Sequence, residues 1–170
     1  MNIADIQAVI DSAVARGTEP LDRYIRFRLP DAKEADVAEV RDVCMEIIDS
    51  VPTFMARAEQ ESEDRKLQHV VGPVLEHIAR YFVSPIDLIP EMTYGLAGLL
   101  DDAYLVLRIL KNLDRGSEPF LDWDLDEPLA FLRGLLGKEM GEKLDHMAMQ
   151  AMNDADEKFA KLWEEIGARA

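Results

Sequence analysis

Apolar residues recur every three or four positions along most of the chain, which is the period of an amphipathic α-helix. The first such stripe predicts a helix that begins at Ile3 and ends near Gly17. Comparable stripes predict helices over residues 21–29, 31–49, 73–83, 96–110, 128–136 and 137–166. No alternation of period two lasts long enough to predict a strand.

Prolines and glycines divide these stripes into separate predicted helices. Ser50 and Pro52 follow the pattern of an N-cap and an early proline, so we expect a new helix to begin there. Gly72-Pro73 predicts the end of one helix and the start of the next. Residues 59–66 are charged and polar, which is typical of a solvated helix face or a linker.

Taken together, the stripes predict an all-α fold: a single-domain helical bundle of about six to eight helices over residues 1–170. A length of 170 residues and a hydrophobic content of 48% are sufficient for one core. We expect residues 73–110 to form the central hairpin, with residues 84–100 as its connecting loop.

The formal net charge of −15 bears on the partners of the protein. A field of this sign repels phosphates, so it argues against nucleic-acid binding. Two interpretations of the charge remain open: it only keeps the protein soluble, or it serves a basic protein partner or a cation. The single cysteine, Cys44, rules out an intramolecular disulfide and a thiolate metal site. No stretch predicts a membrane-spanning helix, and the first residues do not follow a signal-peptide pattern, so a cytoplasmic location is expected.

The most unusual stretch is residues 81–91, where prolines and carboxylates stand in apolar sequence. Ser84, Pro85 and Asp87 follow the pattern of an N-cap and the first and third helical positions. Pro90 prevents that turn from growing, because proline lacks an N–H and clashes with the preceding turn. We interpret these four residues as a structural motif.

Asp87, Glu91, Asp101 and Asp102 stand at the two ends of one short loop, so the fold can bring them together. Carboxylates in apolar surroundings require compensation by a cation or by hydrogen bonds. Three interpretations remain open: helix capping with pairing to neighbouring arginines, a divalent metal ion held by these four acids, and a loop on which a partner docks. The sequence predicts no other cofactor.

The same stretch also resembles a known family. The matching residues are Tyr81, Ser84-Pro85-Ile86-Asp87-Leu88-Ile89-Pro90, Gly98 and Asp101-Asp102. This pattern resembles the signature of the YkvA-like bacterial domain of unknown function, over about residues 66–112. The resemblance implies a small helical domain, often in proteins suspected of membrane association, and it implies no activity. The chain departs from the family pattern at Glu91, usually Asp, and at residues 92–95, usually an apolar run with a proline.

The last predicted helix carries apolar residues spaced as in a heptad seam. These residues are Ala148, Met152, Ala155, Phe159, Leu162 and Ile166. The seam is explained either by packing on the protein's own domain or by homodimerisation through Met152, Phe159, Leu162 and Ile166.

Familiar catalytic and metal-binding motifs are incomplete in this sequence. Residues 122–126 begin like a calcium loop, but the sixth and twelfth positions are Glu127 and Arg133 instead of Gly and Glu. None of the three histidines follows a glutamate by three residues, as a di-iron bundle requires. A Walker loop and a Gly-x-Ser-x-Gly elbow are also absent from the sequence.

Three functions are therefore compatible with the sequence. The first is a non-enzymatic cytoplasmic interaction or adaptor protein, acidic and with a basic or identical partner. The second is a metal-dependent enzyme that uses Asp87, Asp101 and Asp102. The third is a peripheral membrane protein whose apolar loop, residues 88–100, enters the bilayer surface without spanning it.

Overall fold

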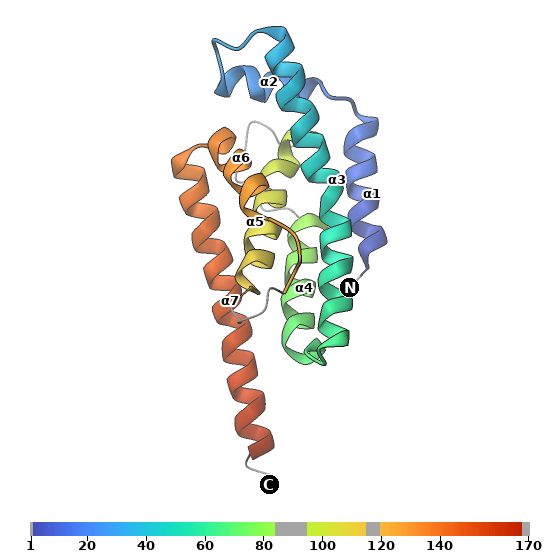
Figure 1. Cartoon of the computed structure of the whole chain (residues 1–170), viewed down its shortest axis with the longest axis vertical. Helices are drawn as coiled ribbons and strands as arrows, with labels where there is room; N and C mark the ends of the chain where they lie inside the picture. Colours follow the sequence, from blue (N-terminus) through green and yellow to red (C-terminus); the bar gives the residue numbers. More distant parts are fainter. Residues whose placement is uncertain (1, 84–94, 115–119, 168–170) are drawn as a thin grey trace.

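Helices account for nearly all of the residues that the structure, a computed structural model, describes, namely 2–83, 95–114 and 120–167 (Figure 1). They are α1 (Ile3–Ala15), α2 (Glu19–Arg28), α3 (Glu34–Asp64), α4 (Gln68–Val83), the short 3-10 helix η2 (Leu96–Gly98), α5 (Leu99–Asn112), α6 (Asp126–Leu136) and α7 (Lys138–Gly167). No strand occurs in these three ranges, and the predicted all-α bundle is confirmed.

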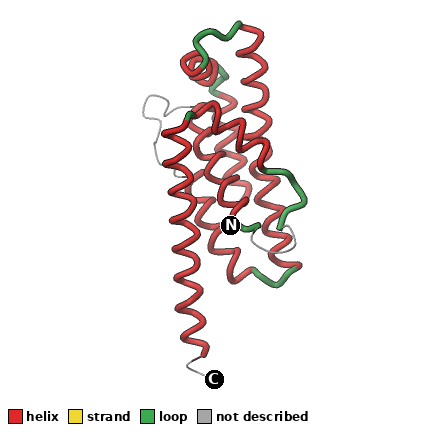
Figure 2. Tube along the Cα trace, turned by 60° about the vertical axis from the view of Figure 1, so that its left-hand side comes forward, coloured by secondary structure: helices red, strands yellow, loops and turns green. Residues whose placement is uncertain are grey.

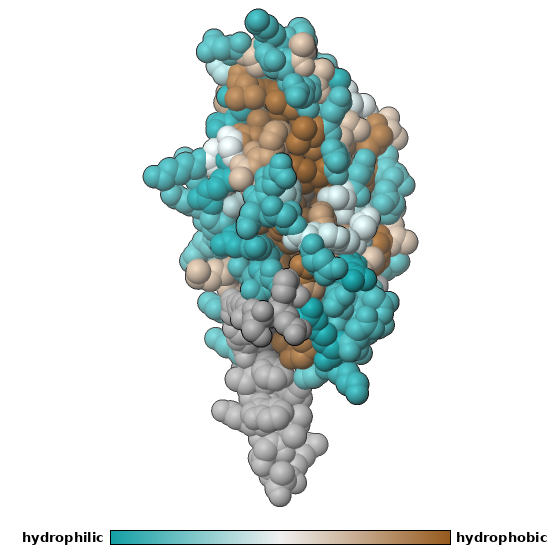
Figure 3. All heavy atoms as spheres, viewed as in Figure 1, coloured by the Kyte–Doolittle hydropathy of each residue, from teal (hydrophilic) through white to brown (hydrophobic). Residues whose placement is uncertain are grey.

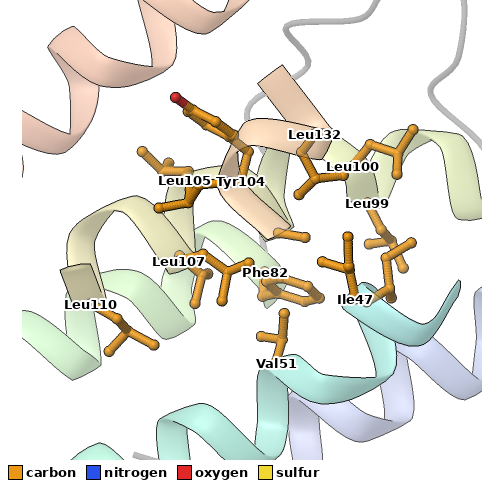
Figure 4. Close-up of a cluster of buried hydrophobic side chains, with 14 of the residues drawn as sticks. Ile47, Val51, Phe82, Leu99, Leu100, Tyr104, Leu105, Leu107, Leu110 and Leu132 are labelled. Atoms are coloured by element: carbon orange, nitrogen blue, oxygen red, sulfur yellow. The ribbon is translucent and has the colours of Figure 1, made fainter. Parts of the chain in front are cut away.

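Helix α5 is the centre of the bundle. Eleven of its fourteen residues are buried, and it packs against α3, α4, α6 and α7. Figure 4 shows Phe82 of α4 among Ile47 and Val51 of α3 and the leucines of α5. Since α4 and α5 pack on each other, the predicted central hairpin is present in the described residues.

The helix break predicted at Ser50 and Pro52 is wrong, because α3 continues through both residues as one helix of 31 residues. A proline in a helix interior costs about 3 kcal/mol. Burial of Val51 and Met55 contributes about 1.5–3 kcal/mol for each side chain, which offsets that cost. The Ser50 hydroxyl also donates to the Ile47 carbonyl at 2.6 Å.

The break predicted at Gly72-Pro73 is wrong for a similar reason. Both residues lie inside α4, and the apolar residues on either side of them, Val71, Val74 and Leu75, are buried. The chain turns earlier, between α3 and α4, where Lys66 adopts a left-handed φ of 59°. Local helix-breaking residues are thus overridden where the neighbouring side chains enter the core.

Helix α7 packs along α5 and α4, and its C-terminal part extends beyond the other helices in both views (Figures 1 and 2). Helix α6 is antiparallel to the start of α7 and closes the upper end of the bundle next to α2 (Figure 1). Within the described ranges, no helix combines the length and the apolar character needed to cross a membrane.

Candidate functional site

The acid pair predicted from the sequence lies in the first turn of α5. Asp101 and Asp102 are its third and fourth residues and are only 4% and 3% exposed. A helix N-terminus offers backbone N–H groups without helical partners and a positive dipole end, both of which stabilise carboxylates. Each of the two also has at least one interaction partner. This position agrees with the capping interpretation of Asp101 and Asp102.

Tyr24 of α2 is buried, and the charge of Asp101 acts on it. Burial raises the pKa of the Tyr24 phenol, the charge of Arg28 lowers it, and the charge of Asp101 raises it further. Helix α2 packs against η2, which comes immediately before α5, and this packing is consistent with the influence of Asp101 on Tyr24.

The remaining residues of the predicted acidic site lie outside the described residues. They are Ser84, Pro85, Asp87, Pro90 and Glu91. Convergence of Asp87 and Glu91 on the acid pair therefore stays a prediction. Across ranges 2–83, 95–114 and 120–167, no group of three or more His, Cys, Asp or Glu side chains is arranged to hold a metal ion.

The described part of the apolar loop proposed for membrane contact is buried. Leu96, Ala97, Leu99 and Leu100 are all in the core, although residues 88–94 lie outside the described residues. Side chains in the core are not available to enter a bilayer. Residues 96–100 thus serve to fix the start of α5.

The predicted dimer seam is divided by the fold. Ala148 and Met152 are buried, and the part of α7 that carries them packs on the protein's own helices α4 and α5. The N-terminal part of the predicted seam is therefore an intramolecular contact. The side chains of Phe159, Leu162 and Ile166 lie outside the described residues, so dimerisation through them stays a prediction.

An open groove between α3 and α6 was not predicted from the sequence. Helix α6 packs against α5, α7 and α2, but its side toward α3 leaves a hollow of about 490 Å³. Apolar side chains form most of the lining, and they are Val43, Ile47, Phe54, Pro128 and Phe131. Figure 3 shows an apolar strip between α3 and α6 that is flanked by hydrophilic residues.

The groove continues toward the loop before α6. A second hollow of about 280 Å³ is lined by Ser50, Thr53, Phe54 and Trp123, and it shares Ser50 and Phe54 with the first. The rings of Phe54 and Trp123 meet edge to face, with centroids 4.7 Å apart. Trp123 remains 38% exposed. The two hollows therefore form one apolar surface that ends at an accessible tryptophan.

Carboxylates surround this apolar surface. Glu46 of α3 and Glu127 of α6 line the groove, and neither forms an ion pair with another described residue. Asp122 and Asp124 flank Trp123 in the loop before α6, and Asp126 is the first residue of α6. Arg57 lies 3.8 Å from Asp122, and Lys111 lies 3.2 Å from Asp126. Among the described residues, the charged side chains that line the two hollows are therefore both carboxylates, Glu46 and Glu127.

A polar network holds α6 in position as one wall of the groove. Tyr104 of α5 donates to Asp145 of α7 at 2.7 Å, and Arg108 donates to the same oxygen at 3.1 Å. Arg133 of α6 donates to the Tyr104 hydroxyl at 3.1 Å and to Asp145. The Tyr104 ring packs in the core while its hydroxyl points away from the buried cluster (Figure 4).

The charges of this network fix its protonation state. Partial burial alone would raise the pKa of Asp145, but hydrogen bonds from Tyr104 and Arg133 and the charges of Arg133 and Arg108 bring it below its usual value. Burial and the bond to Asp145 raise the pKa of Tyr104. Near neutral pH the carboxylate is therefore ionised and the phenol is neutral, which is the state that all of these hydrogen bonds require.

The C-terminal end of α6 is fixed by Arg28 of α2. Its Nε donates to the Leu135 carbonyl at 2.7 Å, which satisfies one of the last carbonyls of the helix. Gly137, with a left-handed φ of 90°, ends the helix, and a Cβ there would meet the Arg28 guanidinium at 2.3 Å. Only glycine allows this approach and this backbone conformation without strain.

A more polar hollow of about 440 Å³ lies between α4 and α7. Its charged and aromatic lining residues are His77, Tyr81, Asp154 and Glu157. The rings of His77 and Tyr81 are perpendicular, with centroids 5.1 Å apart. Burial and the charge of Asp154 raise the pKa of Tyr81. His77 therefore has a packing role against Tyr81.

Cys44 is a structural residue. It is fully buried in α3, and burial raises the pKa of its thiol to about 12. A thiolate is the reactive form of cysteine, and it does not form appreciably at such a pKa near neutral pH.

Comparisons with known proteins give one match. The family described as "Protein of unknown function (DUF1232)" matches residues 78–107, which include the end of α4 and most of α5. The match covers the acid pair and leaves out the residues that line the groove. No curated protein and no solved structure matches the chain.

Proposed function

We propose that this protein is a non-enzymatic interaction protein that binds a helical segment of a partner protein in the groove between α3 and α6. The observation that carries this proposal is the groove itself, an open apolar hollow of about 490 Å³ next to an exposed tryptophan. Its volume is in the range of functional sites, about 300–1,000 Å³. Apolar surface of this kind, rimmed by polar residues, is characteristic of interaction sites.

The walls of the groove support a helical occupant. Two helices, α3 and α6, flank the opening, and the rest of the bundle consists of helices that pack on one another. A third helix that lay between α3 and α6 would bury an apolar stripe against Ile47, Phe54 and Phe131. Recognition of a helix in an apolar groove is a common mode of peptide binding.

The polar groups in the groove support binding over catalysis. They are Glu46, Glu127, Thr53 and Ser50, and the Ser50 hydroxyl already donates to the Ile47 carbonyl of its own helix. A nucleophilic serine requires a base within hydrogen-bond reach, and Ser50 bonds to no carboxylate, histidine or lysine among the described residues. The groove therefore offers shape and charge to a ligand.

Several finer hypotheses from the sequence stand beside this proposal. Membership of the YkvA-like domain is supported by the overlap between its signature and the matched residues 78–107. A cytoplasmic location fits the acidic composition. Self-association through Phe159, Leu162 and Ile166 is a separate hypothesis, which sedimentation of the purified chain would test.

Site-specific photocrosslinking tests the proposal. A photoreactive phenylalanine analogue is placed at Phe131 in the groove or, as a matched control, at Phe27, which is 72% exposed on α2 and does not line the groove. We expect position 131 alone to capture a defined partner in cells. The partner is then identified, purified and titrated, and Phe131→Ala is expected to weaken its binding at least about tenfold while Phe27→Ala leaves it unchanged.

Two results would contradict the proposal. One is equal capture from both positions, and the other is a purified partner whose affinity for the protein is insensitive to Phe131→Ala. Thermal unfolding of both variants controls for loss of the fold, since Phe131 is only half-buried and its removal leaves the core intact.

A further inference from the structure

We infer that the segment that occupies the groove between α3 and α6 is a cationic amphipathic helix, with aliphatic residues on one face and lysines or arginines along the edges of that face. This inference rests on the proposed function, because it specifies the chemistry of the partner at the same groove. It adds a requirement for positive charge, which the shape of the groove alone does not impose.

The first support is the charge on the two walls. Glu46 projects from α3 and Glu127 from the first turn of α6, and both line the hollow and are exposed. Neither is neutralised by a basic residue in the described parts of the chain. A helix laid between α3 and α6 would therefore have one unneutralised carboxylate on each side of its apolar face.

The second support is the loop at the lower end of the groove. Asp122 and Asp124 flank Trp123 there; Asp122 lies 3.8 Å from Arg57, whereas Asp124 forms no ion pair with another described residue. Trp123 lies among them, with its ring edge-to-face against Phe54. An aromatic face beside carboxylates attracts a lysine or arginine through both Coulomb and cation–π interactions. The same features would repel an acidic helix.

The third support is the net charge of −15, which extends the attraction beyond direct contacts. A cationic segment is steered toward an acidic surface and associates faster, whereas a second copy of this chain would carry the same negative charge and be repelled. The net charge of the chain and the residues that line the groove therefore both favour a cationic helix.

The probes for a test are three model peptides of about 18 residues, long enough to form an amphipathic helix. One is built from leucine and lysine at helical spacing, one from leucine and glutamate at the same spacing, and one has the leucine–lysine composition in scrambled order. The reporter is the fluorescence of Trp123 in a Trp163→Phe background, because these are the two tryptophans of the chain.

Saturable binding of the leucine–lysine peptide, with a shift in Trp123 emission, is the expected result. The leucine–glutamate and scrambled peptides should bind at least about tenfold more weakly, because one is repelled and the other lacks an apolar face. Glu46→Gln combined with Glu127→Gln should weaken the leucine–lysine peptide about fivefold, as the loss of two partly solvated ion pairs implies.

The matched control for charge is Asp5→Asn combined with Asp11→Asn. These residues are exposed on α1, which does not line the groove, and the change in net charge is the same. One residue of each pair also lies in the first turn of its helix. This control should alter the affinity for the leucine–lysine peptide by less than about twofold, because the charges are remote and screened.

The experiment distinguishes failure of this inference from failure of the proposed function. If both amphipathic peptides bind equally and Phe131→Ala weakens both, the groove binds helices and only the cationic requirement is wrong. If the control pair weakens binding as much as the groove pair and Phe131→Ala has no effect, the peptide binds the acidic surface at large and both are wrong. A third outcome is that Trp123 emission changes with protein concentration but not on addition of the peptides. A second copy of the protein would then occupy the groove, and the inference of a cationic helical partner would be wrong.

Discussion

The first turn of α5 and the groove between α3 and α6 are opposite kinds of region. The first has an unusual sequence, with Asp101-Asp102 in apolar surroundings, and the structure buries both residues in the interior. The second has an ordinary sequence on two amphipathic helices, and the structure leaves its apolar face open. In this protein, therefore, the unusual acid pair is a buried part of the structure. The proposed interaction surface instead arises from the placement of two amphipathic helices, α3 and α6, whose sequences are not unusual.

The largest expected effect on stability is that of removing a phenylalanine from the core, compared with removing one from the groove. Phe82 is fully buried between α3 and α5, so Phe82→Ala should reduce the free energy of unfolding by about 3–5 kcal/mol. Phe131 is half-buried in the groove, so Phe131→Ala should cost about 1 kcal/mol or less. Urea unfolding of the two variants measures both values, and equal losses would show that the groove is part of the core.

A substitution at Gly137, which connects α6 to α7, should have the next largest effect on stability. Gly137→Ala places a Cβ against the Arg28 guanidinium and forces alanine into a left-handed φ, so we expect a loss of about 2 kcal/mol. Gly72→Ala is the matched control. It lies inside α4 with no atom close to its Cβ position, and it should stabilise the protein by about 0.5–1 kcal/mol. Opposite signs for these changes in calorimetric stability are the expected result.

Removal of one hydroxyl tests the network that positions the wall of the groove. Tyr104→Phe loses the bonds to Asp145 and Arg133, and we expect a loss of about 1 kcal/mol. Tyr81→Phe removes a hydroxyl that bonds to no other described residue and should change stability by less than about 0.5 kcal/mol. If both variants unfold at the same urea concentration, the network does not stabilise α6.

The same network predicts a weak pH dependence. The pKa of Asp145 is lower in the folded protein than its usual value, so its contribution is complete above the usual range of Asp, near pH 4. The contribution is lost as the pH falls through the folded pKa, because protonation removes the carboxylate that Tyr104, Arg108 and Arg133 contact. Stability measured between neutral and acid pH should therefore decrease less in Asp145→Asn than in the wild type.

Metal titration is expected to give the smallest effect. Asp101 and Asp102 are buried at a helix N-terminus and already have interaction partners, so Mg²⁺, Mn²⁺, Ca²⁺ and Zn²⁺ should leave the melting temperature of the wild type unchanged. A ligand that binds the folded state raises this temperature. An increase in the wild type that Asp101→Asn abolishes would instead establish the acid pair as part of a metal site.

The sequence predicted helices well wherever local pattern and tertiary packing agree. The starts of α5 and α6 and the length of α7 follow their apolar stripes closely. It failed at Pro52 and at Gly72-Pro73, where local propensity predicts a break and burial of the neighbouring side chains keeps the helix continuous. A single sequence does not show how much apolar surface a given turn will bury, so it cannot settle such conflicts.

By itself, then, the sequence determined the helical class and the acidic charge, because periodicity and charge are local properties of the chain. The tertiary structure decided which apolar stripes are covered. It covered Met152 with the protein's own helices and left Phe54 and Phe131 facing an open groove. Whether an apolar face is core or binding surface depends on the neighbouring helix, and that neighbour is fixed by the packing of the whole bundle.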